Sequence, residues 1–386
     1  MTSQGPQATP APGRTGPLTG IRLIELEAIG PVPLAAMILA DLGAEVVRIT
    51  RPSAGYWGAV GAAVVFRGRA TVQLDLKAAA DRDRLLDLVA GADGLIEGGR
   101  PGVMERLGLG PDVCIGRNPR LVYARVTGWG QEGPLAERAG HDITYLAMTG
   151  ALHAIGKADR PPAVPLNLIG DYAGGTMFAA LGIVSALLQV RASGRGQVID
   201  VAMVDGVAVL LSLFHELLAA GRWRDARGMN FLDGAAPYYR CYACADGRHV
   251  AVGALEPAFF RQLLDGLDIP ADRYDQTDQA GWPQMEQDFA AAFGSRPRDE
   301  WERRFAGTDA CVAPVLSLTE AIQHPANTAR QTFIRHNGVD QASPAPRFSV
   351  TPGSIGTQQA ADLQDLTAAW GADRNFEQDP KKSTEI

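Results

Sequence analysis

The sequence predicts an α/β protein with a doubly wound parallel sheet and a second, smaller α+β domain. Three observations support this fold class. Apolar runs of strand length alternate with helical patterns through the first third of the chain. The 386 residues are enough for two hydrophobic cores. Composition also shifts towards Gly, Arg and Asp around residues 221–236, which is typical of a domain boundary.

Five apolar runs mark strands of the predicted sheet. They cover residues 21–26, 46–49, 71–76, 94–96 and 121–126. Helical patterns separate them at residues 34–42, 79–90 and 101–107. Gly43 closes the first of these helices, and Pro101 opens the last. This alternation favours a Rossmann-like parallel sheet with a ligand crevice at the carboxyl ends of its strands.

Longer apolar stretches follow in the middle of the chain. Residues 143–152 and 177–188 predict buried helices, and the second is too short to span a bilayer. Residues 198–201 predict a further strand, and residues 204–220 a second long apolar helix. Residues 238–255 alternate about an Ala-Asp-Gly turn, which predicts a hairpin in the smaller domain.

These patterns suggest a division of the chain into a large and a small domain. We expect a flexible tail over residues 1–16, a large domain over 17–205, a linker helix over 206–232, a small domain over 233–322, and a return linker over 323–339 leading to residues 340–386, which complete the large domain.

The bulk composition excludes several classes of function. A net charge of −7 without a dense Lys/Arg run argues against binding to nucleic acid. No segment predicts a signal peptide or a membrane span. Four cysteines in so long a chain form no disulfide framework, which predicts a cytoplasmic protein.

Common cofactor motifs are missing from the sequence. The first turn, residues 30–33 (GPVP), lacks the glycine fingerprint of a dinucleotide site, and its prolines lack N–H groups that a pyrophosphate needs. No Walker motif or nucleophile elbow is present. Cys241 and Cys244 have the spacing of metal ligands, but no second Cys pair completes a site. We therefore expect neither a nicotinamide nor a metal.

Two segments each pair a glycine with an ionisable side chain before a helical pattern: residues 139–145 (AGHDITY) and 169–175 (IGDYAGG). They place His141 and Asp171 at or just before two predicted helix starts, where free N–H groups favour negative charge. Two different proton carriers near such helix ends could move a carbon-bound proton through an enolate. The alternative is that Asp171 only caps its helix.

Basic residues recur near the predicted strand ends. They are Arg51, Arg67, Arg69, Lys77, Arg100 and Arg106. Scattered arginines of this kind are commonly solvated surface. The alternative is a phosphate-bearing ligand across the crevice, held by guanidinium groups. In the second domain, Glu256 ends a predicted strand directly before Pro257.

Several further motifs occur in a fixed order along the chain. They are residues 16–23 (GPLTGIRL), 41–49 (DLGAEVVRI), 74–77 (LDLK), 97–102 (EGGRPG), 105–110 (ERLGLG) and 127–130 (TGWG), followed by the His141 and Asp171 segments. In order and spacing, from about residue 16 to about residue 350, the chain resembles the family III CoA-transferase superfamily and, within it, the α-methylacyl-CoA racemases.

The resemblance implies the family III CoA-transferase fold as an interlocked homodimer, in which CoA binds to the large domain and the partner's small domain completes the acyl site. By motif position, nine residues correspond to CoA contacts. They are Ile29, Arg51, Leu74, Leu76, Lys77, Gly98, Gly99, Arg100 and Arg106. The substrate is then an acyl-CoA thioester, and CoA is part of that substrate rather than a separate cofactor.

The resemblance also assigns roles in catalysis. His141 and Asp171 correspond to the acid/base pair of the racemases, and Glu256 to a supporting residue from the small domain. Asp142 would offer its backbone N–H to the thioester oxygen. The implied reaction inverts the α-carbon of 2-methylacyl-CoA thioesters by proton transfer through an enolate, without metal, flavin or nicotinamide.

Two alternatives stay open from the sequence. In CoA-transferases of the superfamily, the Asp at the position of Asp171 is a nucleophile that forms an acyl anhydride, although the Gly-His-Asp context resembles the racemases. The other alternative is an acyl-CoA-binding protein without activity. The chain departs from the family pattern at Glu27, Ala70 and Gly99, which concerns the nucleotide end and the acyl pocket.

Overall fold

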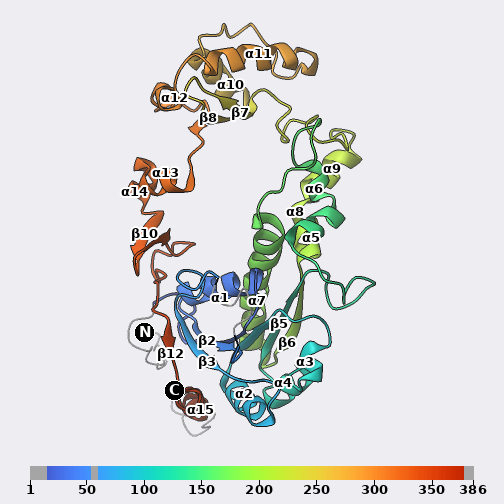
Figure 1. Ribbon diagram of the computed structural model, residues 1–386, viewed down its shortest axis with the longest axis vertical. Coiled ribbons are helices and arrows are strands. Elements are labelled where there is room, and N and C mark those ends of the chain that lie inside the picture. Colours follow the sequence, from blue (N-terminus) through green and yellow to red (C-terminus); the bar gives the residue numbers. More distant parts are fainter. Residues whose placement is uncertain (1–14, 54–59, 378–386) are drawn as a thin grey trace, which may run out of the picture. The chain divides into compact units, whose positions relative to one another are not determined.

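The computed structural model describes residues 15–53 and 60–377. Residues 1–14 of the expected tail therefore lie outside the described part. The chain forms two compact units: the first contains residues up to 149, 166–210 and 331 onwards, and the second contains residues 150–165 and 211–330. The α/β fold class predicted from the sequence is confirmed, because the first unit is built on a parallel sheet (Figure 1).

The sheet has seven strands in the order β12-β3-β2-β1-β4-β5-β6, and every neighbouring pair is parallel. The strands are β1 (Arg22–Leu26), β2 (Glu45–Thr50), β3 (Arg69–Gln73), β4 (Gly94–Glu97), β5 (Val122–Thr127), β6 (Gln197–Ala202) and β12 (Gln359–Ala360). The strand order reverses between β1 and β4. In a doubly wound sheet a ligand crevice forms at this reversal.

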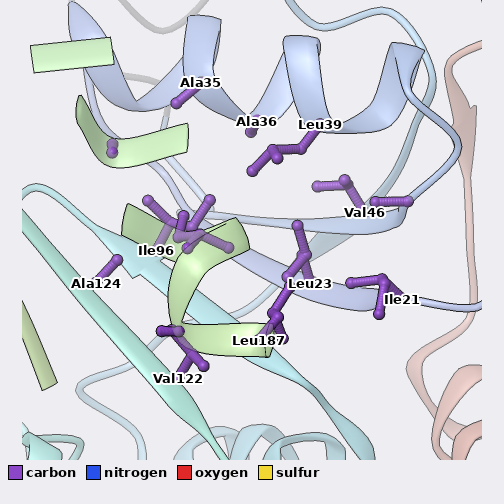
Figure 2. Close-up of a cluster of buried hydrophobic side chains, with 14 of the residues drawn as sticks. Ile21, Leu23, Ala35, Ala36, Leu39, Val46, Ile96, Val122, Ala124 and Leu187 are labelled. Carbon is purple, nitrogen blue, oxygen red and sulfur yellow. The ribbon is translucent and has the colours of Figure 1, made fainter. Parts of the chain in front are cut away.

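Helices cover both faces of the sheet. They are α1 (Pro31–Asp41), α2 (Ala79–Gly91), α3 (Val103–Arg106), α4 (Pro111–Arg117), α7 (Met177–Ser193) and α15 (Leu363–Glu377). Leu39 of α1 and Leu187 of α7 pack on Leu23 and Val122 of the sheet (Figure 2). A second core on the opposite face contains side chains from α2, α4 and α15, including the fully buried Trp370.

The third strand begins earlier than its apolar pattern predicts, at Arg69 instead of residue 71. The Arg69 guanidinium is completely buried and lies 2.7 Å from Glu25 on β1, a distance that joins Nε to Oε2. Glu25 also pairs with Arg48 on β2. Buried charges are tolerated only when they are paired, so this strand start depends on partners that are distant in the sequence.

The predicted long helices are interrupted. Residues 143–152 form two short helices, α5 (Asp142–Thr149) and α6 (Ala151–Ala154), separated by Gly150 at φ 85°. Residues 204–220 likewise form α8 (Met203–Leu210) and α9 (Ser212–Ala219). The prediction that residues 143–152 are buried was also wrong, since Met148 is 66% exposed.

The helix before β6 is longer than predicted. A π-helical segment, η1 (Leu168–Thr176), runs directly into α7, and together they are long and apolar enough to cross a membrane by length and composition. Less than half of its most apolar stretch is buried, and Leu181 and Leu188 are 63% and 61% exposed. The prediction of a core helix holds for one face, which places Ile183 and Leu187 in the core, but the helix is longer than predicted and is not buried all round.

The second unit contains a three-stranded antiparallel sheet, β7-β8-β9, under an aromatic core. Its strands are β7 (Tyr239–Ala243), β8 (His249–Gly253) and β9 (Val312–Pro314), and its helices include α10 (Pro257–Gly266), η2 (Gln279–Gly281), α11 (Trp282–Phe293), α12 (Arg298–Phe305), α13 (Leu318–Gln323) and α14 (Pro325–Arg330). The predicted hairpin is confirmed as β7 and β8.

Residues 150–165 belong to the second unit, whereas the sequence placed them in the large domain. Arg227 explains the difference, because its guanidinium donates to the carbonyl oxygens of His153, Lys157 and Arg160. After residue 330 the chain returns to the first unit, forming the hairpin β10 (Phe333–His336) and β11 (Val339–Ala342) before β12 extends the sheet.

Candidate active site

A cavity of about 290 Å³ lies in the first unit, at the carboxyl ends of the central strands. Ile29 and Gly30 contribute to its wall from the loop after β1, and Gly98, Gly99 and Arg100 from the loop after β4. The segment after β5 and residues 136–141 complete much of the lining. The cavity therefore occupies the reversal of strand order, as the sequence predicted for the ligand crevice.

His141 and Asp171 both line this cavity, although thirty residues separate them. His141 directly precedes α5. Its N–H donates to Thr144 Oγ1 at 3.0 Å, and its carbonyl accepts from the Thr144 hydroxyl at 2.7 Å and N–H at 2.8 Å. These reciprocal bonds fix the backbone of His141 and leave its imidazole exposed towards the cavity.

Asp171 is not at a helix start, as the sequence suggested, but inside η1. Asn167 Nδ2 donates to Asp171 Oδ2 at 3.2 Å, from four residues earlier. Gly30 lies so close that a methyl group on it would be 3.0 Å from the same oxygen. The wide turns of a π-helix often occur at functional sites, and this one presents a half-buried carboxyl group to the cavity.

Asp142 connects the two segments. Its side chain is buried, and Oδ2 accepts the backbone N–H of Asp171 at 2.8 Å. Asp142 is also the first residue of α5, and in the described part of the chain its own N–H donates to no protein acceptor. A free N–H at a helix start is suited to stabilising negative charge on a ligand oxygen.

The surroundings alter the acidity of Asp171. Burial raises the pKa of its carboxyl group, and the nearby carboxylate of Asp142 raises it further. The hydrogen bond from Asn167 and the side chain of His141 oppose this rise. Tyr145, which lines the same cavity, has its pKa raised to about 12, first by burial and then by the charge of Asp171. Tyr145 therefore stays protonated at neutral pH.

Of the nine predicted CoA contacts, four line the cavity: Ile29, Gly98, Gly99 and Arg100. The others are Arg51, Leu74, Leu76, Lys77 and Arg106, which lie outside its lining. Leu74 as a whole is 1% exposed, and its side chain lies in the core. Arg51 is exposed and pairs with Glu27, whose Oε2 accepts its N–H at 2.8 Å.

Glu97 supports the loop that carries Arg100, a role that the sequence did not indicate. The buried Glu97 carboxylate accepts the Gly99 N–H at 2.5 Å and the Arg125 Nε–H at 3.1 Å. Arg125 pairs in turn with Glu105. Burial raises the pKa of Glu97 to about 7, against the opposing effects of these two donors. This carboxyl group therefore titrates near neutral pH.

Glu256 lies in the second unit, where it is exposed directly before α10. It does not end a strand, because β8 already ends at Gly253. Its predicted support of His141 and Asp171 stays a prediction. Within residues 15–53 and 60–377, no group of His, Cys, Asp or Glu side chains is arranged to hold a metal ion.

Asn167 is the clearest site residue that sequence reasoning missed. The sequence indicates Asn167 only by its position four residues before Asp171. That spacing brings the two side chains together only if the segment is helical through residue 171. Arg138 was also missed. It lines the cavity from an irregular segment whose sequence predicts no element.

Comparisons with known proteins agree on one family. The model of CoA-transferase family III matches residues 18–361. The α-methylacyl-CoA racemases of Mus musculus and Homo sapiens are 44% and 43% identical to the chain, and each match covers 87% of both proteins. A solved CAIB/BAIF family protein from Brucella suis has a TM-score of 0.77 at 25% identity, covering 93% of this chain and all of that one.

Proposed function

The chain belongs to CoA-transferase family III, and we propose that it is an isomerase that inverts the α-carbon of 2-methylacyl-CoA thioesters. The observation that carries the proposal is the cavity shared by His141 and Asp171, two different proton carriers. The identity of 43–44% to two racemases supports the same reaction.

The chemistry begins with a weakly acidic hydrogen next to the thioester carbonyl. Removing it requires a base close to the carbon and a donor for the developing enolate oxygen. We assign the base and acid roles to His141 and Asp171 and the oxygen donor to the free N–H of Asp142. Inversion follows when one residue takes the proton from one face and the other delivers a proton to the opposite face.

This pair must hold one proton between its two members. Asp171 in water would be ionised at neutral pH, so burial and the neighbouring Asp142 carboxylate bring its acidity closer to that of an imidazole. A smaller difference in acidity between the Asp171 carboxyl group and an imidazole makes the rates of proton transfer in the two directions more nearly equal. Proton transfer alone completes the reaction, which therefore needs no metal, flavin or nicotinamide.

The remaining assignments concern binding and assembly. Ile29, Gly98, Gly99 and Arg100 contact CoA from the cavity wall, and Arg51, Leu74, Leu76, Lys77 and Arg106 extend the contacts beyond it. Glu256 of a partner subunit supports the acid/base pair in an interlocked homodimer. We place the protein in the cytoplasm, in keeping with four free cysteines.

The decisive experiment follows α-proton exchange in D₂O. A single-enantiomer 2-methylacyl-CoA is incubated with the protein without an acceptor acid, and deuterium at C2 is measured together with chirality. A racemase incorporates deuterium as optical purity is lost. A CoA-transferase has no need to touch C2, so CoA transfer to an added carboxylic acid without exchange would instead make Asp171 a nucleophile.

Variants of the pair test the assignment. His141→Ala and Asp171→Ala are each expected to reduce racemisation by at least about 100-fold, the effect of losing a positioned acid or base. Binding of the CoA ester, measured by calorimetry, is expected to survive because neither residue belongs to the CoA contacts. Near-normal turnover in either variant would exclude the two-base assignment.

A further inference from the structure

The side chain of Asp142 is unusual among the groups around the cavity because it is a buried carboxylate without a cationic partner. It is 6% exposed, and in the described part of the chain no Lys, Arg or His forms an ion pair with it. One oxygen accepts the Asp171 N–H, and the other, Oδ1, has no hydrogen-bond partner. Burying a charge in this way costs free energy, so we expect this arrangement to serve a function.

The surrounding backbone is built to admit this contact. A methyl group on Gly170 would lie 2.7 Å from Asp142 Oδ2 and 3.3 Å from its Cα. Only a residue without a side chain lets the start of α5 approach η1 so closely. The hydrogen bond joins the residue after His141 to the backbone of Asp171, and it therefore links the segments that carry the two proton carriers.

The same contact brings two carboxylates together. The charge of Asp142 disfavours the ionised form of Asp171, whereas Asn167 favours it through a hydrogen bond to Oδ2. The other titratable groups that interact with this pair are His141 and Tyr145, and Arg100 in turn interacts with Tyr145. Asp142 and Asn167 thus act on one carboxyl group in opposite directions, through different atoms.

We propose that the Asp142 side chain is a positioning residue, which fixes Asp171 against the His141 segment and keeps a second negative charge beside the Asp171 carboxylate. The inference rests on the proposed function, and it is separate from the role of the Asp142 backbone N–H. Any residue except proline can supply that N–H, whereas only an acidic side chain supplies both the acceptor and the charge.

The test compares Asp142→Asn with Asp142→Ala. Asparagine keeps an oxygen that can accept the Asp171 N–H but removes the charge, and alanine removes both. We expect kcat to fall about 10-fold in Asp142→Asn and about 100-fold or more in Asp142→Ala, with KM for the CoA ester within about 2-fold. Thermal unfolding of both variants shows whether either has lost its fold.

A direct titration makes the test independent of turnover. Aspartate labelled with ¹³C at the side-chain carboxyl is followed by NMR against pH, and the Asp171 signal is assigned by its loss in Asp171→Asn. Relative to the wild type, we expect the midpoint to fall by about one pH unit in Asp142→Asn and to rise in the matched control Asn167→Ala. The acid limb of the kcat/KM profile is expected to move in the same two directions.

Two results would overturn the inference. One is an unchanged midpoint in Asp142→Asn, and the other is a shift of the same sign in Asp142→Asn and Asn167→Ala, which indicates only a general disturbance. Failure of the proposed function is recognised separately, because a wild-type protein without α-proton exchange can still show the two opposite shifts.

Discussion

Three carboxyl groups in or next to the segments that form the cavity, those of Glu97, Asp142 and Asp171, are each held by a different set of partners. Glu97 has the Gly99 N–H and Arg125, while Asp142 has only the Asp171 N–H within the described chain. Asp171 itself has the Asn167 amide. The cost of burying such a group falls with the number of donors that face it. Among these groups, burial raises the pKa of Glu97 to about 7, in spite of its two donors.

Glu97 gives a prediction about stability against pH. Its pKa is raised from 4.5 to about 7 in the folded protein, so between these values the folded state keeps a proton that the unfolded state has lost. Stability then falls as pH rises through this window and changes little above it. Glu97→Gln removes the effect. We expect the variant to gain on the order of 3 kcal/mol relative to the wild type between pH 4.5 and 7.5.

Urea unfolding at several pH values measures this gain. Glu105→Gln is the matched control, because the exposed Glu105 also bonds Arg125 but has a lowered pKa. Desolvation alone would raise this pKa, and the hydrogen bonds and the charge of Arg125 together outweigh it. Its carboxylate contributes stability above its unfolded pKa, so this variant should lose stability relative to the wild type as pH rises. Parallel pH profiles of Glu97→Gln and the wild type would contradict the assignment.

Sequence patterns identified the two reactive residues, but they did not identify the contacts that hold the site residues in place. His141 and Asp171 could be selected because each follows a glycine before an apolar helical pattern. The bond from Asp171 N to Asp142 and the pairing of Arg51 with Glu27 could not be selected in this way. They depend on how segments 24 and 29 residues apart approach in space, which periodicity does not describe.

At the scale of elements, the irregular helix η1 is what places Asp171 in the cavity. It packs closely on α8, where Gly206 faces Gly174. The apolar pattern predicted the helix that follows but not its π-helical start, because a widened turn has no hydrophobic signature. The apolar pattern also did not predict that the helices are interrupted at Gly150 and Leu211, since a continuous apolar pattern favours an unbroken helix.

The η1–α8 contact gives a prediction about both stability and activity. A methyl group on Gly206 would lie 2.0 Å from the carbonyl oxygen of Gly174, which is backbone and cannot turn aside. Gly206→Ala is therefore expected to destabilise the first unit by about 2 kcal/mol. It should also lower racemisation, because Gly174 lies one helical turn after Asp171 in η1.

Gly116→Ala controls for the change in helix propensity. Gly116 lies in α4 and is exposed, and nothing is within 4 Å of an added methyl group, so alanine should stabilise the protein by up to about 1 kcal/mol. Circular dichroism melts and turnover are compared for both variants. Equal stability changes of the same sign would show that η1 and α8 do not depend on close glycine contact.

For the whole molecule, the parallel sheet and its strand reversal follow directly from the alternation of apolar runs with helical patterns. The same alternation does not predict which apolar side chains remain outside both cores of the first unit. Met177, Leu181 and Leu188 of α7 are 49%, 63% and 61% exposed, and their spacing puts them on one face of the helix. An exposed apolar face of this kind normally meets another molecule.

A second copy of the chain and a lipid bilayer are the two occupants to distinguish for this face. We expect the partner to cover this face in the proposed homodimer, so the wild type should have the mass of a dimer in light scattering. Leu181→Glu places a charge in that contact and is expected to give monomers with at least about 10-fold lower racemisation, since burying an unpaired charge at an interface costs several kcal/mol. Val113→Glu on α4 is the control, because this residue is 46% exposed on a helix of the opposite sheet face.

A different result would assign the α7 face to the membrane. In that case the wild type is a monomer that sediments with phospholipid vesicles, and the Leu181→Glu variant no longer sediments with them.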